Sequence, residues 1–309
     1  MSVQQVQEFL SPIFSGKLHK KRLESLENAV LGTIESASLS VSAIGRGLAS
    51  ARCLVEKHAI KQIDRLLSNP AFDTWKLAES WAEFILRGEK EIFINLDWTD
   101  FDADNQTTIF AGVQTTHGRS VPILWKTVSK AKLKNRRNEY EDELLLRLRE
   151  LIPQEIVVTI VADRGFADQK LFEFLAELGF HYIIRLKSNT KITNSKGETR
   201  KGIDWVGKNG RMRVIRNGSV TADKCPVKAV ICVKDKGMKD AWILVSSRSD
   251  LGGSQTKKQY GKRFSIEETF NITIPFNAND PTNSTFDISN VSTIISAVEN
   301  LVNSASGKN

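Results

Sequence analysis

Two acidic residues stand at the ends of short apolar runs, where their carboxylates are able to do chemistry together. Asp97 ends the run EIFINLD, and Asp163 ends the run IVVTIVAD. If the two runs form neighbouring strands, both carboxylates meet at one edge of a sheet. Hard divalent cations take oxygen ligands, and two such ions stabilise the attacking and leaving oxygens of an in-line phosphoryl displacement. The sequence therefore predicts a metal site suited to cleaving phosphodiesters.

A third acid, Glu267, lies in the segment KKQYGKRFSIEETF, which has helical character. Tyr260, Arg263 and Glu267 are spaced three and four residues apart, so they share one face of a helix. One interpretation is that this face brings a third carboxylate to the first two. The other is an exposed helix with an incidental ion pair between Arg263 and Glu267.

The elements that must position these acids predict an α/β fold with a mixed sheet. The expected order is strands at 91–99, 108–116 and 120–128, a helix at 138–151, a strand at 156–166, a helix at 168–179 and a strand at 181–187. The segments MRVIRN, KAVICVK and WILVSS then predict a β-rich insertion over residues 188–256 that interrupts this arrangement. A helix is expected to begin near Lys257.

The motifs INLDWT, VADRGF and Y-x-x-R-x-x-x-E occur in this order over about residues 15–270. Together they resemble the DDE transposases of bacterial insertion sequences, in the branch with a YREK signature, the insertion-sequence-four type. The resemblance implies a ribonuclease H-like mixed sheet with a β-rich insertion. It also implies that Asp97, Asp163 and Glu267 are catalytic and ligate two Mg²⁺ ions, for which Mn²⁺ substitutes.

The same resemblance suggests roles for neighbouring residues. Tyr260 and Arg263 would contact phosphates of the transposon end, because a guanidinium offers a fixed charge and a bidentate fork. Arg164 would do likewise or form a structural ion pair. Trp242 would stack on an extruded base, or pack in the core as part of the apolar segment WILVSS.

The N-terminal part of the chain shows helical periodicity at 22–36, 40–49 and 54–70. The last two segments fit a helix-turn-helix, and they fit a small helical bundle equally well. Three basic residues suit contacts with DNA phosphates: Lys57, Lys61 and Arg65.

These patterns divide the chain into five parts. They are a helical DNA-binding region at 1–88, the first part of the catalytic core at 89–187, the insertion at 188–256, the helix with the third acid at 257–270, and an atypical tail at 271–309. In the tail, Asn271 to Ile274 stand where the family has a basic continuation of its motif, and Asn, Ser and Thr dominate thereafter. A frameshift, a recombination scar and a truncated copy all explain such a change.

Composition agrees with an anionic partner, since the formal net charge is +8. The three cysteines are too few and too scattered for a disulfide framework or a four-ligand zinc site. No apolar run approaches 18 residues and the first residues lack a signal peptide pattern, which predicts a cytoplasmic protein without a membrane segment. By resemblance, the partners are double-stranded DNA, as terminal inverted repeats and target, and a second copy in a homodimer on DNA at the bacterial nucleoid.

Three functions follow as hypotheses. The first is a transposase that hydrolyses the phosphodiester at element ends and joins the freed 3′ hydroxyl to target DNA. The second, motivated by the altered tail, is a catalytically defective DNA-binding remnant that recognises terminal repeats. The third is a general nuclease of the same fold, which would cleave without preference for transposon ends.

Overall fold

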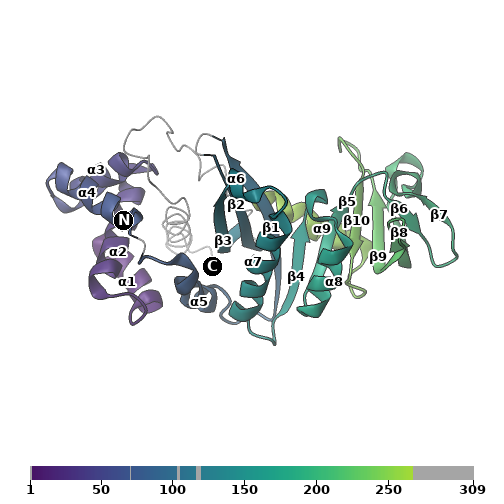
Figure 1. The fold of residues 1–309 in the computed structure, drawn as a ribbon, viewed down its shortest axis with the longest axis horizontal. Coiled ribbons are helices and arrows are strands. Elements are labelled where there is room, and N and C mark those ends of the chain that lie inside the picture. The colour runs from purple at the N-terminus through teal and green to yellow at the C-terminus, as the bar shows by residue number, and fades with distance from the viewer. Residues whose placement is uncertain (1, 70, 103–104, 116–119, 267–309) are drawn as a thin grey trace.

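The computed structural model describes residues 2–69, 71–102, 105–115 and 120–266. Within these ranges, helices at the N-terminal end are followed along the long axis by a sheet with helices on both faces, and then by a β-rich end (Figure 1).

Helices α1 to α5 pack around a core of their own at the N-terminal end. Their bounds are α1 (Val3–Phe14), α2 (Lys20–Ser36), α3 (Val41–Arg52), α4 (Glu56–Leu67) and α5 (Thr74–Ile85). Small residues allow α2, α3 and α4 to approach closely: a Cβ at Gly32 would lie 2.4 Å from the carbonyl oxygen of Ile44. A Cβ at Gly45 would lie 2.5 Å from Cα of Ile60. Helices α2, α3 and α4 correspond to the three expected helices, whereas α1 and α5 were not predicted.

The central sheet begins with three antiparallel strands and continues with two parallel ones. These are β1 (Glu91–Phe101), β2 (Gln106–Gln114), β3 (Ser120–Ser129), β4 (Val157–Ala162) and β5 (His181–Leu186). Strand β1 pairs with β2 antiparallel and with β4 parallel, and β4 pairs with β5 parallel. This mixed sheet is consistent with the expected ribonuclease H-like fold. The predicted strand over 156–166 is shorter than expected, because the chain turns after Ala162 into the 3₁₀ helix η2 (Arg164–Phe166).

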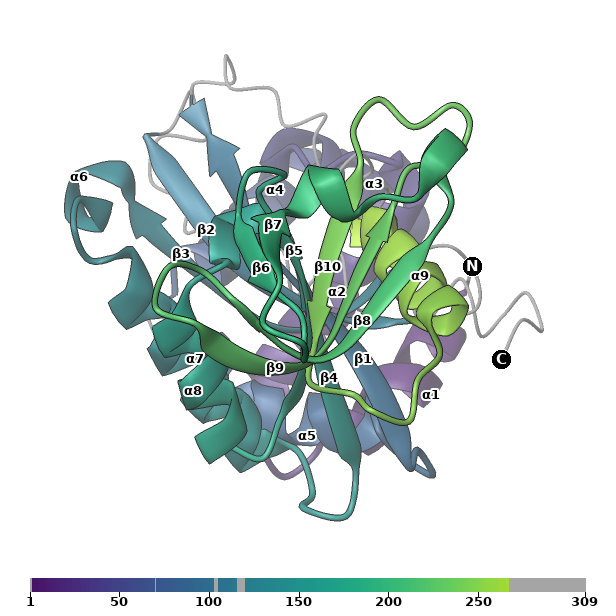
Figure 2. The ribbon, with the colours of Figure 1, turned by 90° about the vertical axis from the view of Figure 1, so that its right-hand side faces the viewer.

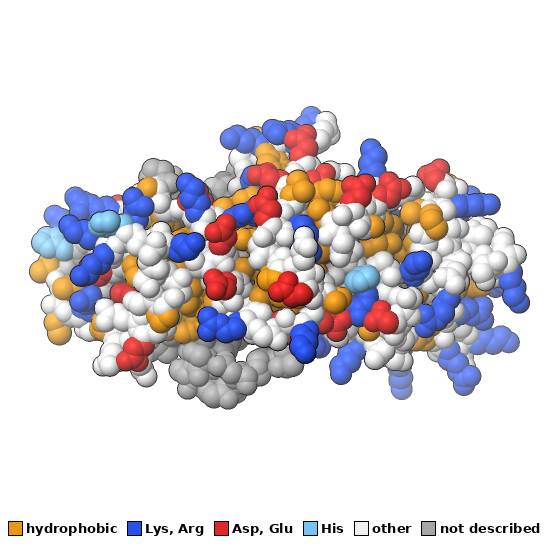
Figure 3. Space-filling view, turned by 90° about the horizontal axis from the view of Figure 1, so that it is seen from below, with side chains coloured by type: hydrophobic (Ala, Val, Ile, Leu, Met, Phe, Trp, Pro, Cys, Tyr) orange, Lys and Arg blue, Asp and Glu red, His pale blue; other side chains and the backbone are white. Residues whose placement is uncertain are grey.

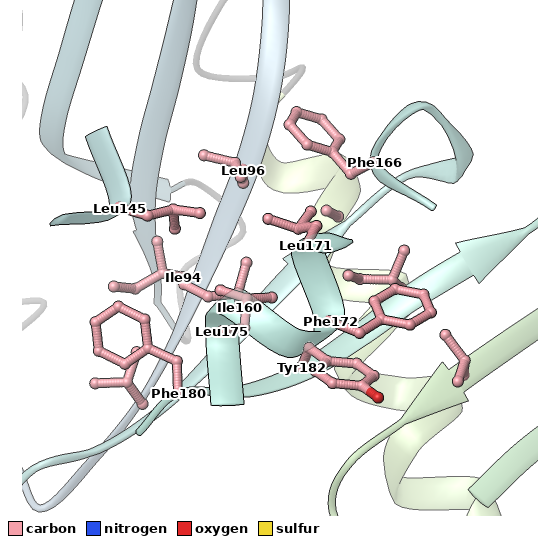
Figure 4. Close-up of a cluster of buried hydrophobic side chains, with 14 of the residues drawn as sticks. Ile94, Leu96, Leu145, Ile160, Phe166, Leu171, Phe172, Leu175, Phe180 and Tyr182 are labelled. Atoms are coloured by element: carbon pink, nitrogen blue, oxygen red, sulfur yellow. The ribbon is translucent and has the colours of Figure 1, made fainter. Parts of the chain in front are cut away.

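One face of the sheet is covered by α7 (Arg137–Leu151) and α8 (Gln169–Glu177), with the short α6 (Lys130–Leu133) preceding them. Their apolar side chains meet those of β1, β4 and β5 in the largest core, part of which is drawn in Figure 4. In the alternating pattern of β1, Ile92, Ile94 and Leu96 face this core, so Asn95 and Asp97 face the opposite side.

The β-rich segment continues the same sheet, which corrects the expectation that it interrupts the α/β arrangement. Its elements are β6 (Lys191–Thr193), β7 (Thr199–Lys201), η3 (Gly202–Trp205), η4 (Lys208–Gly210), β8 (Arg213–Val220), β9 (Cys225–Val233) and β10 (Trp242–Ser246). The last strand, β10, pairs antiparallel with β5, and β9, β8, β6 and β7 follow outward. The strand order is β3-β2-β1-β4-β5-β10-β9-β8-β6-β7 in the part of the chain that is described.

The last described helix, α9 (Gly253–Gly261), with η5 (Lys262–Phe264), lies on the sheet face opposite α7 and α8 (Figure 2). It packs on a second cluster that includes Val161, Ile183 and Leu244. Helix α9 begins at Gly253 rather than near Lys257. The capping interaction explains this earlier start, because the side chain of Gln255 accepts a hydrogen bond from the backbone N–H of Gly252 at 2.8 Å.

Arg248, just after β10, ties the end of the β-rich segment to the central strands. Its buried guanidinium donates to Oγ1 of Thr159 at 3.0 Å, lies 2.7 Å from Oε1 of Glu91 and donates to both carboxylate oxygens of Asp250. These hydrogen bonds hold the pKa of Asp250 at about 2. We refer to this group of residues as the Arg248 clamp.

Strand β3 stands first in the sheet order, and α5 covers its outer edge. The indole N–H of Trp75 donates to the carbonyl oxygen of Trp125 at 2.8 Å, and that of Trp81 donates to the carbonyl oxygen of Pro122 at 2.7 Å. A proline within β3 suits an edge strand, since it has no N–H to offer a further strand.

Candidate active site

The parallel register of β1 and β4 brings the first two predicted acids to one edge of the sheet. Leu96 is aligned with Ala162 in the β1–β4 pair, and the residues that directly follow these two in the chain are Asp97 and Asp163. Neighbouring parallel strands lie about 4.8 Å apart, so the two carboxylates emerge close together. The sheet face on which they emerge is the one that α9 covers.

The Asp97 carboxylate accepts hydrogen bonds on both of its oxygens. Its Oδ1 accepts the backbone N–H of Trp98 at 2.9 Å, and its Oδ2 accepts from Arg263 at 2.8 Å. The Arg263 side chain is 7% exposed and that of Asp97 is 21% exposed, so this ion pair is largely shielded from solvent. The structure pairs Arg263 with the first acid, a contact that sequence spacing did not predict; an ion pair of Arg263 with Glu267, which lies outside the described residues, is not tested.

Asp163 adopts an extended backbone and caps the short helix η2. Its Oδ1 accepts the backbone N–H of Gly165 at 2.6 Å. A Cβ at Gly165 would lie 2.9 Å from that same oxygen, so a glycine keeps the carboxylate in this position.

Tyr260 lies beneath the two acids and is completely buried. Burial raises the pKa of its hydroxyl and the charge of Asp163 adds to the rise, while Arg263 and Arg185 oppose it. The hydroxyl has no hydrogen-bond partner among the described residues. A buried polar atom without a partner costs about 1–3 kcal/mol, so a water or a phosphate oxygen at this place would stabilise it.

The aromatic ring of Trp242 packs against the ring of Tyr260. The two rings meet edge to face at 4.9 Å, and the Trp242 ring stacks on that of Phe264 at 6.0 Å. Trp242 is half-buried at the start of β10. Packing, one of the two interpretations of this residue, describes these contacts; stacking on a base stays a prediction.

A buried polar network, which sequence reasoning missed, fastens the α9 segment to the sheet. Asn95 donates to Oγ of Ser120 at 2.7 Å and to Oγ of Ser265 at 3.2 Å, and it accepts from Gln114 at 2.7 Å. Gln114 also donates to the carbonyl oxygen of Gln259 at 3.1 Å. We call these residues the Asn95 network. The polar Asn95 in the apolar run EIFINLD was the available signal.

The described chain ends beside the first acid. Ile266 is fully buried against Phe110 and Trp125, and Phe110 is the cross-strand partner of Asp97. Glu267 and the tail at 271–309 lie outside the described residues. Within the described ranges, His, Cys, Asp and Glu form no group of three that would hold a metal ion.

The predicted DNA-contacting residues outside this site are all exposed. Arg164 is exposed directly after the second acid, and both interpretations of it, a contact with DNA phosphate and a structural ion pair, stay predictions. On α4, Lys57, Lys61 and Arg65 point to solvent. Lys61 and Arg65 line a cleft of about 670 Å³ between α2 and α4, together with Lys21, Arg22, Ser25, His58, Gln62, Leu66 and Asn69. We call it the α2–α4 cleft.

The basic excess of the chain is concentrated in the β-rich segment. Residues 188–256 contain 14 Lys and Arg against 6 Asp and Glu, so this segment alone carries a net charge equal to the +8 of the whole chain. Figure 3 shows Lys and Arg side chains gathered towards both ends of the molecule and Asp and Glu mostly over its middle part. Potentials of this kind attract polyanions.

Comparison with known proteins relates the chain to a protein family. A family model described as a transposase DDE domain matches residues 90–273, which is more than half of the chain. No curated protein matches the chain. In the described part of the chain, no helix has the length and apolar character needed to cross a membrane.

Proposed function

The chain belongs to the family of transposase DDE domains, and from this premise we propose that it cleaves the phosphodiester at the ends of an insertion sequence and joins the freed 3′ hydroxyl to target DNA. The observation that carries the proposal is the meeting of Asp97 and Asp163 at one sheet edge, under a helix that leads towards Glu267. The branch with the YREK signature remains part of the proposal. An altered tail after Phe270 also remains part of the proposal.

The donor set suits hard cations. Asp97 and Asp163 supply carboxylate oxygens, the ligand type that hard divalent cations prefer, at one edge of the sheet. We propose Asp97, Asp163 and Glu267 as ligands of two Mg²⁺ ions, with Mn²⁺ as a substitute. Such ions, when bound, supply Lewis acidity to the attacking and leaving oxygens.

The chain's own residues would orient the DNA. Arg263 forms an ion pair with Asp97, and its guanidinium, a rigid fork of donors, would also contact a phosphate beside the acids. The buried hydroxyl of Tyr260 would donate to a phosphate oxygen, which supplies its missing partner. Exposed Arg164, directly after Asp163, would contact the backbone of the same strand, and Trp242 remains a candidate platform for an extruded base.

Binding of double-stranded DNA would involve both ends of the molecule. At the helical end, Lys57, Lys61 and Arg65 would contact phosphates of the terminal inverted repeat, with the α2–α4 cleft beside them. At the other end, the basic β-rich segment would follow the flanking or target duplex. We also propose a homodimer on DNA, and a cytoplasmic location at the bacterial nucleoid, as the family resemblance implies.

The test is nicking, with Mg²⁺ or Mn²⁺, of a duplex that carries the terminal repeat of the parent element. The wild type is compared with Asp163→Ala and with Asp168→Ala, which makes the same chemical change in the same loop at the cap of α8. We expect nicking by the wild type and by Asp168→Ala, and loss of at least about 100-fold in Asp163→Ala.

Binding without nicking by any of the three would replace the proposal with the defective DNA-binding remnant. Nicking without preference for terminal repeats would favour a general nuclease. Equal nicking by Asp163→Ala would exclude the proposed acid site.

A further inference from the structure

Helix α7 carries a carboxylate at a position where the helical spacing of its leucines predicts an apolar side chain. Glu141, Leu144, Leu145 and Leu148 form the stripe that faces the sheet, and Glu141 is only 6% exposed. Burial raises the pKa of Glu141, while hydrogen bonds from Trp98 and Arg137 oppose the rise. Burial of a charged carboxylate costs free energy unless the group is paired, so Glu141 depends on its hydrogen-bond partners.

The first partner is the residue directly after the first acid. The indole N–H of Trp98 donates to Oε1 of Glu141 at 2.8 Å, on the α7 side of the sheet. On the other side, the backbone N–H of the same Trp98 donates to Oδ1 of Asp97 at 2.9 Å. Glu141 therefore holds the residue that orients the Asp97 carboxylate.

The second partner reaches the turn that carries the second acid. Arg137 donates to Oε1 of Glu141 at 3.2 Å, and its guanidinium lies 5.1 Å from the ring centre of Trp98 and 6.0 Å from that of Phe166. Phe166 ends the turn after Asp163, and its backbone N–H donates to the carbonyl oxygen of Asp163 at 3.1 Å. Figure 4 shows Phe166 next to Leu96 and Leu171, in the core behind the site.

We propose that Arg137 and Glu141 act as positioning residues that set the separation of the Asp97 and Asp163 carboxylates. They act through Trp98 on one strand and Phe166 on the turn after the other, and they do so from the sheet face opposite the acids. The inference rests on the proposed function, because the separation matters if the two carboxylates bind metal together. Loss of such supporting contacts lowers metal affinity by about 10-fold to 100-fold.

The test measures metal affinity without relying on catalysis. Tb³⁺, a hard cation that tryptophan excites, is titrated into the full chain and then competed with Mg²⁺; Asp97→Asn defines the signal that belongs to the site. The variants are Glu141→Leu, Glu141→Gln, which keeps the acceptor for Trp98, and Glu139→Leu, an equal change at an exposed position of the same helix. Thermal unfolding is recorded for each.

We expect Glu141→Leu to weaken site binding by about tenfold or more. Glu141→Gln and Glu139→Leu should stay within about twofold of the wild type, on the same principle that the supporting contact is retained. A lower unfolding midpoint with unchanged affinity would show a purely structural role and overturn the inference. If Glu141→Leu does not fold, Arg137→Met tests the same contacts, and unchanged affinity there has the same meaning. Absence of any Asp97-dependent signal in the wild type would overturn the proposed metal site itself, and the inference with it.

Discussion

Replacing Asn95 with leucine removes the centre of the Asn95 network while keeping a side chain of similar size. Asn95 is fully buried, and the substitution removes its hydrogen bonds to Ser120, Ser265 and Gln114. The bonds to Ser120 and Gln114 lie within the sheet, whereas the bond to Ser265 and a longer one of 3.5 Å to the carbonyl oxygen of Lys262 reach the α9 segment. At about 1 kcal/mol net for each of these two bonds, the segment loses about 2 kcal/mol of attachment to the sheet. Since about 1.4 kcal/mol is a factor of ten, the detached population rises roughly 25-fold.

Amide hydrogen exchange is the direct measurement. Exchange should accelerate in residues 253–266 by up to roughly 25-fold, the same factor as the attachment equilibrium, and stay unchanged in α7. Nicking should fall at least about tenfold, because α9 and η5 carry Tyr260 and Arg263, whereas binding to the terminal repeat should persist. Thr193→Val is the matched control, since it removes one bond between Thr193 and Thr199, at 2.8 Å, in strands far from α9.

A uniform increase in exchange throughout the sheet would refute the reasoning, because it would show that Asn95 contributes to global stability alone. Unchanged exchange in residues 253–266 would refute it as well. In that case apolar contacts of the kind made by Ile266 would be sufficient to hold the segment.

Three further predictions concern binding and stability. Lys61→Gln with Arg65→Gln should weaken duplex binding and reduce the slope of log affinity against log salt by about 0.9 per lost phosphate contact; an unchanged slope would exclude the α2–α4 cleft as a DNA contact. Lys191 and Lys201 are cross-strand partners, so replacing both with glutamine should lower the salt slope and also raise the unfolding midpoint slightly, because two like charges no longer face each other. The pKa of Asp250 lies at about 2, below its ordinary value of 3.8, so its contribution to stability is present above about pH 4 and is lost as pH falls towards 2. The difference in unfolding midpoint between wild type and Asp250→Asn should therefore be largest near neutral pH and vanish near pH 2, and a difference independent of pH would contradict the Arg248 clamp.

The central strands could be predicted from sequence because their periodicity records local burial. The run IVVTIVAD is apolar on both faces, and β4 is indeed covered on both. Two helices escaped prediction for local reasons. Pro12 lies inside α1, and a proline ordinarily argues against a helix. In α5, the small side chains of Ala78 and Ala82 weaken the apolar stripe that would indicate a helix.

Contacts between distant segments were beyond sequence reasoning. The pairing of β10 with β5 joins residues about sixty positions apart and decides that the β-rich segment extends the sheet. The ion pair between Arg263 and Asp97 spans an even greater separation, which helical spacing within one segment cannot reveal. The sequence predicted that Asp97 and Asp163 meet at one sheet edge only if their strands are neighbours. The pairing of β1 with β4 supplies that condition.

The indole N–H groups of Trp75 and Trp81 in α5 affect whether the sheet can be separated from the N-terminal helices. Trp75 and Trp81 occupy carbonyl groups on the open side of β3 that would otherwise accept another strand. A chain shortened to begin at residue 89 would keep every described strand and both described acids, yet it would leave these two carbonyl groups of an edge strand without their indole donors, and unpaired edges promote self-association. At the far end, β7 is short and carries exposed Arg200 and Lys201, so that margin is already protected by charge. The N-terminal helices therefore protect the β3 edge of the sheet from self-association, in addition to forming a core of their own.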